Sequence, residues 1–233
     1  MPRLVQKHSL ATRWFHWVNF PVLGVMVGSG LLIYWANDVY RVGVGGWTLI
    51  RFFPDWVYRL LSLDHGLALG MGWHFAFAWL FVLNGLAYVV YIVSSGEWRQ
   101  LVPRRRHFRE AWDVVRHDLG LRKEPLPPAK FNAAQRVTYS AIVVMGALIT
   151  MTGFAIYRPT QLAWLTALCG GYQAARFEHF WLMMGFVAFF GLHLVQVVRA
   201  GWNNFRAMVI GVERVDAPPE APAASPAPSE VRP

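Results

Sequence analysis

The chain has 233 residues, of which 55% are hydrophobic and 15% are charged, and its formal net charge is +9. This composition excludes an ordinary soluble domain and is typical of a small multi-pass membrane protein. The single cysteine, Cys169, excludes an intrachain disulfide and any zinc or iron–sulfur site built from several cysteines.

Four nearly uncharged segments are each long enough to cross a bilayer as a helix, which takes about 20 residues. They cover residues 14–36, 66–95, 137–157 and 177–199. The sequence therefore predicts an all-α membrane protein in which four transmembrane helices form a bundle over residues 14–212. Residues 1–13 are expected to precede the bundle, and the Pro/Ala-rich residues 213–233 to follow it as a disordered tail.

The basic residues lie mainly on one side of these segments. Of the 22 Lys and Arg residues, 17 lie before the first segment, between the second and third, or from the last residue of the fourth segment, Arg199, onward. The positive-inside rule then places both termini and the loop 94–136 in the cytoplasm. The net charge is thus explained by topology and by contact with anionic lipid, and nucleic-acid binding is not expected.

The two long connections differ in pattern. The outer connection, residues 37–65, interleaves aromatic residues and Leu with Arg51 and Arg59. This pattern predicts an amphipathic segment on the membrane surface, a platform for an extracytoplasmic partner, or both. The inner connection predicts an amphipathic helix near residues 108–119, followed by a Pro-rich linker at 123–130.

The fourth segment carries two histidines, His179 and His193, fourteen residues apart. Fourteen residues make just under four helical turns, so both imidazoles leave the same face, about 21 Å apart. Ionisable side chains inside a bilayer segment are costly and are treated as functional. Two of them near opposite edges of a hydrocarbon core about 30 Å thick indicate axial ligands for two stacked haems.

Depth in the bilayer gives each of these histidines a partner. His16 and His193 lie about 5 Å and about 9 Å from the inner ends of their segments, so they share a level. His74 and His179 each lie about 30 Å from the inner end and share the opposite level. His65 would lie about 44 Å away, outside the bilayer, and is set aside.

Each histidine taken alone has an ordinary alternative. His16 and His179 lie near segment ends, where an interfacial histidine is common. His74 and His193 would otherwise need a buried polar partner, for which the helices offer Asn84, Thr138, Thr150, Thr152 and Gln196. As depth-matched pairs, the four residues instead predict two bis-histidine haems. The remaining histidines, expected to be solvated, are His8, His107 and His117.

Two axial imidazoles fill the coordination of a haem iron, so such a centre passes single electrons and binds no substrate at the metal. Without a Cys-x-x-Cys-His motif, covalent attachment of the haem is excluded. Small and basic residues near the ligands fit a macrocycle and its propionates, and equally fit helix packing and interfacial anchoring. They are Gly70, Gly72, Gly185 and Gly191, with Arg13, Arg158, Arg176 and Arg199.

Three motifs carry a resemblance to a known family: TRWFHW in the first segment, GWHF in the second and EHF-x11-LH in the fourth. Over about residues 8–210 the chain resembles the bacterial di-haem cytochrome b561 family. More closely, it is similar to the cytochrome b (gamma) subunits of formate dehydrogenases, nickel–iron hydrogenases and thiosulfate-reductase-like enzymes. The resemblance implies two b haems between the helices, held by His16 and His193 on the cytoplasmic side and by His74 and His179 on the periplasmic side.

The same resemblance implies a multi-pass protein of the bacterial inner membrane that exchanges electrons with ubiquinone or menaquinone near the cytoplasmic haem. A periplasmic partner is expected at the outer haem, either a molybdopterin-type or other redox subunit or a c-type cytochrome. The chain is then an electron-transfer subunit and not the catalytic one. No motif identifies the quinone contacts, and position alone suggests Lys7, His8, Asn132, Gln135 and Asn203.

Two other functions stay open from the sequence. A stand-alone superoxide:ubiquinone oxidoreductase of the cytochrome b561 type would use the same four helices and four histidines, with the outer arginines attracting the anion. A haem-free transporter or assembly factor would use the histidines as metal or proton sites.

Overall fold

Four long helices dominate the computed structural model, which describes residues 3–37, 40–63, 65–122, 124 and 132–215. Each is long and apolar enough to cross a membrane, which confirms the predicted all-α membrane fold. These helices are α1 (Leu10–Trp35), α3 (Leu67–Ser94), α6 (Ala133–Tyr157) and α8 (Tyr172–Ile210).

Helix α8 is longer than its predicted span because it continues past a break. At Gly201 the backbone has φ 79° and ψ 173°, a conformation that is not helical. Glycine reaches positive φ without the steric penalty that a Cβ would impose, so the chain can change direction here. The uninterrupted part of α8 therefore ends close to the predicted boundary at residue 199.

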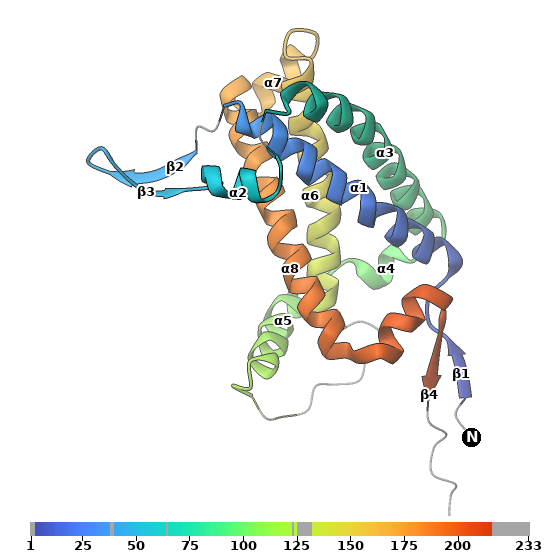
Figure 1. Cartoon of the computed structure of the whole chain (residues 1–233). Coiled ribbons are helices and arrows are strands. Elements are labelled where there is room, and N and C mark those ends of the chain that lie inside the picture. Colours follow the sequence, from blue (N-terminus) through green and yellow to red (C-terminus); the bar gives the residue numbers. More distant parts are fainter. Residues whose placement is uncertain (1–2, 38–39, 64, 123, 125–131, 216–233) are drawn as a thin grey trace, which may run out of the picture. The chain divides into compact units, whose positions relative to one another are not determined.

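The outer connection contains a β-hairpin that the sequence analysis did not predict. Strands β2 (Arg41–Val44) and β3 (Trp47–Arg51) pair antiparallel around Gly45 and Gly46, whose φ angles are +56° and +85°. Two successive residues at positive φ make the tight turn that favours hairpins. The hairpin projects from its unit (Figure 1), and Trp47 on it is 79% exposed. Among the described residues of this connection, only the short α2 (Asp55–Leu60) is helical.

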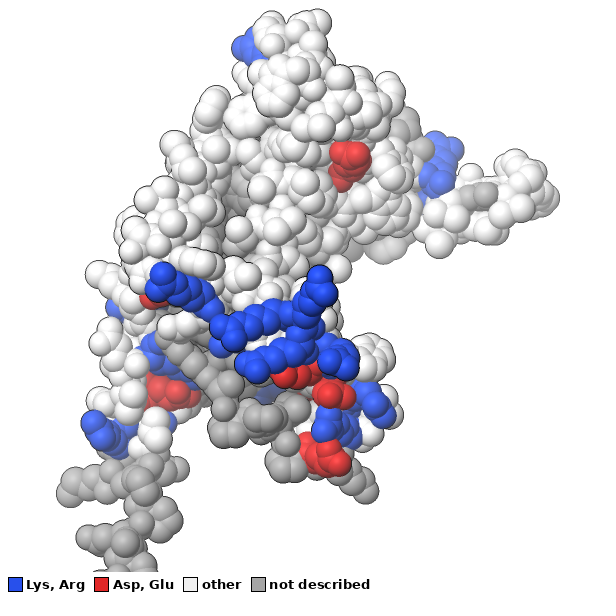
Figure 2. All heavy atoms as spheres, turned by 180° about the vertical axis from the view of Figure 1, so that it is seen from behind, with Lys and Arg blue, Asp and Glu red and all other residues white. Residues whose placement is uncertain are grey.

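The inner connection contains the predicted amphipathic helix, but one histidine on it differs from expectation. Helix α5 (Arg105–Asp118) matches the expected amphipathic helix and follows the short α4 (Trp98–Leu101). Lys and Arg side chains gather over α4 and α5, whereas the long helices above them are nearly free of charge (Figure 2). His107 was expected to be solvated, and this is wrong. It is only 6% exposed, because its Nδ1 accepts a hydrogen bond from the Arg104 backbone N–H at 2.9 Å at the start of α5.

By contacts the chain forms two compact units, residues 15–191 and residues 1–14 with 192–233, and each is described by itself. In the smaller unit, β1 (Arg3–Gln6) pairs antiparallel with β4 (Val212–Val215). Residues 213–215 therefore belong to a strand, although they were expected in the tail.

Side-chain bonds reinforce this ladder in the smaller unit. The Lys7 ammonium donates to Asn204 Oδ1 and to Glu213 Oε1, each at 2.9 Å, and Arg13 donates to the Val209 carbonyl at 2.7 Å. Both ends of the described chain are thus tied together. The rest of the predicted tail, residues 216–233, and most of the predicted linker lie outside the described residues.

In the larger unit, α1 and α3 pack closely where glycines face α1. A Cβ on Gly70 would lie 2.6 Å from Leu32 Cβ and 3.0 Å from the Ser29 carbonyl oxygen, and one on Gly66 would lie 2.6 Å from Leu32 Cδ2. Gly70 therefore serves close approach of the two helices, the packing alternative considered above for this residue.

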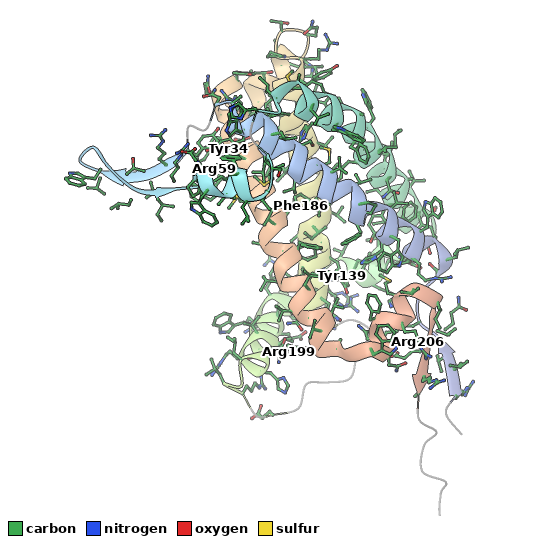
Figure 3. All side chains as sticks on the ribbon, in the orientation of Figure 1. Tyr34, Arg59, Tyr139, Phe186, Arg199 and Arg206 are labelled. Carbon is green, nitrogen blue, oxygen red and sulfur yellow. The ribbon has the colours of Figure 1, made fainter. Side chains whose placement is uncertain are left out.

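Aromatic rings join the outer connection to the helices of the larger unit. Phe180 of α8 lies 4.9 Å from Tyr34 of α1 and 4.6 Å from Tyr40, measured between ring centroids. Tyr34 lies beside α2, and Phe186 lies further along α8 (Figure 3). Burial raises the pKa of the Tyr40 phenol, against a smaller opposing effect of Arg176, so this ring stays neutral within the cluster.

Candidate functional site

Two of the four predicted ligands face each other inside the larger unit. The rings of His74 on α3 and His179 on α8 have centroids 6.3 Å apart and planes inclined by 68°. Each residue lies about two turns from the start of its helix. The structure thus brings together the pair that depth alone had matched.

The separation of these rings fits one metal ion between them. A bond from an imidazole nitrogen to a metal is about 2.0–2.1 Å long, so two such bonds and the radii of two rings together span about 6 Å. Edge-to-face packing of two rings covers the same range of centroid distances, so the separation by itself does not choose between a ligand pair and simple packing. The contacts on the far side of each ring are therefore informative.

Each ring is held at Nδ1 by a hydroxyl group of a neighbouring helix. Ser29 Oγ of α1 lies 3.0 Å from His74 Nδ1, and Thr152 Oγ1 of α6 lies 3.0 Å from His179 Nδ1. Both hydroxyl residues are buried, with 4% and 1% of their surface exposed. A metal ion bound by either ring would therefore be held at the other ring nitrogen, Nε2.

The residue after each hydroxyl is a glycine that lies against the same ring. A Cβ on Gly30 would lie 3.4 Å from His74 Cε1, and a Cβ on Gly153 would lie 3.3 Å from His179 Cε1. The contact at Gly153 is tight, so a side chain there would press on the imidazole, whereas the one at Gly30 lies at the limit of ordinary contact.

These two glycines and the role of both hydroxyls were not predicted from the sequence. Gly185 was a candidate for contact with a macrocycle, but a Cβ there would meet Met145 Cε at 2.7 Å, so that glycine serves helix packing. Thr152 was considered only as a partner for His74 or His193. The available signal was the recurrence of a hydroxyl residue followed by glycine, Ser29–Gly30 and Thr152–Gly153, on the long helix preceding each histidine.

The other two predicted ligands lie in different units. His16 is on α1 in the larger unit, where its ring lies 5.1 Å from that of Trp17. His193 is on α8 in the smaller unit. The pairing of His16 with His193 therefore stays a prediction.

Four of the five positions suggested for quinone have structural roles in the fold. Asn132 Oδ1 accepts from the Gln135 backbone N–H at 2.8 Å, and Gln135 Oε1 accepts from the Asn132 N–H at 3.0 Å, which caps the start of α6. Lys7 is paired with Glu213. The Asn203 side-chain amide donates to the backbone carbonyl of Arg214, and its oxygen accepts the N–H of the same residue.

Comparison with known proteins gives two matches. Residues 7–211 match the family described as Prokaryotic cytochrome b561. A protein of Azospira oryzae, YedZ1, provisionally named as a protein-methionine-sulfoxide reductase subunit, is 30% identical over 193 residues. The aligned part covers 82% of this chain and 89% of that relative. The family match includes the four long spans and all four candidate histidines.

Proposed function

The chain belongs to the prokaryotic cytochrome b561 family, and we propose that it carries electrons between the quinone pool and a periplasmic redox partner. Membership makes it a multi-pass membrane protein that binds haem b and transfers electrons across the membrane. The proposal adds the number of haems, their ligands and the two ends of the path.

The facing rings of His74 and His179 carry the proposal. Their centroid spacing of 6.3 Å fits one metal ion between them, so the two residues would hold the haem iron, and each ring is already held at Nδ1 by a buried hydroxyl. A haem with two axial imidazoles supplies one-electron oxidation and reduction without an open position for a substrate. The pair lies among helices that are long and apolar enough to cross a membrane.

A second haem is proposed between His16 and His193. The support is the spacing of fourteen residues between His179 and His193, which places both on one face of a helix at different depths. Two haems at these levels shorten each electron-transfer step across the bilayer.

The proposed orientation puts both ends of the chain in the cytoplasm of a bacterial inner-membrane protein. Pairing of β1 with β4 requires the segments before α1 and after α8 to lie on one side of the membrane, as an even number of crossings does. The excess of basic residues favours the cytoplasm for that side. His74 and His179 then belong to the periplasmic haem, while ubiquinone or menaquinone reacts at the cytoplasmic one.

The proposed partner is a periplasmic oxidoreductase subunit of the molybdopterin type or another redox class, with a c-type cytochrome as a further candidate. The name of the Azospira oryzae relative, a reductase subunit, supports such a division of labour. The chain is then the electron-transfer subunit and not the catalytic one. A stand-alone superoxide oxidoreductase gains less support, because Arg51 in the outer connection is paired with Asp55 at 3.1 Å.

The test is a dithionite-reduced-minus-oxidised spectrum with haem quantitation on the purified protein. Wild type is compared with His74→Ala, His193→Ala and, as a control on α5, His117→Ala. We expect two low-spin b haems per chain, a different one lost in each of the first two variants, and no loss in the control. Absence of haem, or haem content indifferent to both substitutions, would overturn the ligand assignment. Failure of quinol to reduce the haems would overturn the quinone link.

A further inference from the structure

The contacts behind His74 and His179 are alike although they come from different helices. In each case a long helix presents a buried hydroxyl and then a glycine to the histidine of the next long helix along the chain. Ser29 and Gly30 of α1 meet His74 of α3, and Thr152 with its following glycine on α6 meets His179 of α8. A repeated arrangement of this kind calls for a common chemical purpose.

Counting protons fixes the direction of the bonds to the rings. Ser29 Oγ lies 2.6 Å from the Val25 carbonyl oxygen, and Thr152 Oγ1 lies 3.0 Å from the Leu148 carbonyl oxygen. Two oxygens at such distances share a proton, and only the hydroxyl has one to give. The hydroxyl oxygen can then only accept from the ring, so Nδ1 carries the imidazole proton.

We propose that Ser29 and Thr152 are positioning residues that fix the tautomer of the two haem ligands and lower the potential of the haem they share. The inference rests on the proposed function, in which His74 and His179 bind one iron. With Nδ1 protonated, the lone pair is on Nε2, and both rings are ready to bind the metal without first exchanging a proton.

The same bonds act on the redox equilibrium. A hydrogen bond from Nδ1–H to an acceptor makes the imidazole a more basic ligand. A hydroxyl that already donates to a carbonyl is a better acceptor, because hydrogen bonds in a chain polarise one another. A more basic ligand stabilises ferric over ferrous iron, so the two hydroxyls together favour the oxidised haem.

The glycines leave room for the rings beside the hydroxyls. With a Cβ on Gly153 the nearest ring atom, His179 Cε1, would lie at 3.3 Å, so the ring would have to shift by a few tenths of an ångström from its place beside Thr152. The hydroxyl and the glycine thus act together: the hydroxyl accepts a hydrogen bond from the ring, and the glycine lets the ring lie close to the helix backbone.

The experiment is a potentiometric titration of both haems in Thr152→Val, Ser29→Ala and the conservative Thr152→Ser, with Thr150→Val on the same helix as control. The haem that His74→Ala removes identifies the affected centre. We expect Thr152→Val and Ser29→Ala each to weaken the ferric preference of that haem about tenfold, which raises its midpoint by about 59 mV for one electron. Thr152→Ser and Thr150→Val should keep the wild-type potential.

A second readout needs no haem. In haem-free protein with ¹⁵N-labelled histidine, the nitrogen shifts of His179 should report a proton on Nδ1 in wild type and a mixture of tautomers in Thr152→Val. A wild-type ring protonated at Nε2 would overturn the inference. Unchanged potentials in both hydroxyl variants would also overturn it while leaving the ligands in place, whereas two intact haems in His74→Ala and His179→Ala would overturn the proposed function with it.

Discussion

His74 and His179 receive the same support from different surroundings. Next to Thr152 along α6, a buried apolar cluster joins α6, α7 (Ala163–Leu168) and the start of α8, and Leu165 is one of its members. Around Ser29 there is no such cover among the described residues, and α1 is held to α3 by Leu32 lying over Gly70. The helix that carries Thr152 is therefore held by packed apolar side chains. The helix that carries Ser29 is held by its close approach to α3, which the lack of a side chain at Gly70 permits.

The largest effect is expected from removing the ligands themselves. His74→Ala and His179→Ala should each abolish the same haem, and the double variant should lose no more than either single one, because in the proposed function both residues bind one iron. Haem quantitation per chain checks this. If the double variant lost two haems while each single variant lost one, His74 and His179 would bind different haems. The contacts of Ser29 and Thr152 could then not be compared as supports of one haem.

The contribution of the buried apolar cluster near Thr152 is tested by Leu165→Ala. Removing a buried leucine side chain leaves a cavity and should lower the free energy of unfolding by about 2–5 kcal/mol. Denaturant titration in detergent measures this change. Leu168→Ala, two-thirds exposed on the same short helix, is the matched control and should have little effect. An equal loss of unfolding free energy in the two variants would show that the buried cluster does not stabilise this region.

The close approach of α1 and α3 near Ser29 is tested by Gly70→Ala. The added methyl would meet Leu32 Cβ at 2.6 Å, and overpacking of this kind destabilises by about 1–3 kcal/mol. Gly72→Ala, on the same helix with nothing within 4 Å of its new Cβ, should be tolerated. A neutral Gly70→Ala would mean that α1 and α3 can separate without loss.

The smallest effect is expected at the starts of the two supporting helices. Asn132 caps α6 in a reciprocal box with a bond of 2.8 Å, whereas Ser9 caps α1 through one longer bond of 3.2 Å to the Thr12 N–H. Loss of a cap costs about 0.5–2 kcal/mol, and we expect Asn132→Ala to cost more than Ser9→Ala. The free energies of unfolding of both variants, with Asn132→Asp retaining the acceptor, measure the order.

The sequence predicted the features that depend on composition and on position along one helix. The spans follow from hydropathy, and the pairing of His74 with His179 follows from counting residues to the inner ends. Contacts that depend on the rotation of one helix against another were beyond reach. Thr152 was recognised as a polar residue but not as the partner of His179, and Gly153 gave no signal apart from its position after a hydroxyl residue.

Local turn chemistry explains the other differences. Gly45 and Gly46 permit a tight hairpin in a connection whose apolar residues had suggested only a surface segment. The backbone N–H at the start of α5 needs an acceptor, and His107 provides it and becomes buried. Neither outcome is visible in charge or hydropathy, because both depend on where single backbone groups find partners.

Pairing of β1 with β4 also sets an order of events during biosynthesis. The first strand leaves the ribosome before any of the spanning helices, but its partner ends only at Val215. At about 5–20 residues per second, β1 has no partner strand for on the order of 10–40 s. The two strands therefore pair only after every spanning helix has been translated. A nascent chain arrested earlier would expose the unpaired edge of β1, which distinguishes it from the full-length chain.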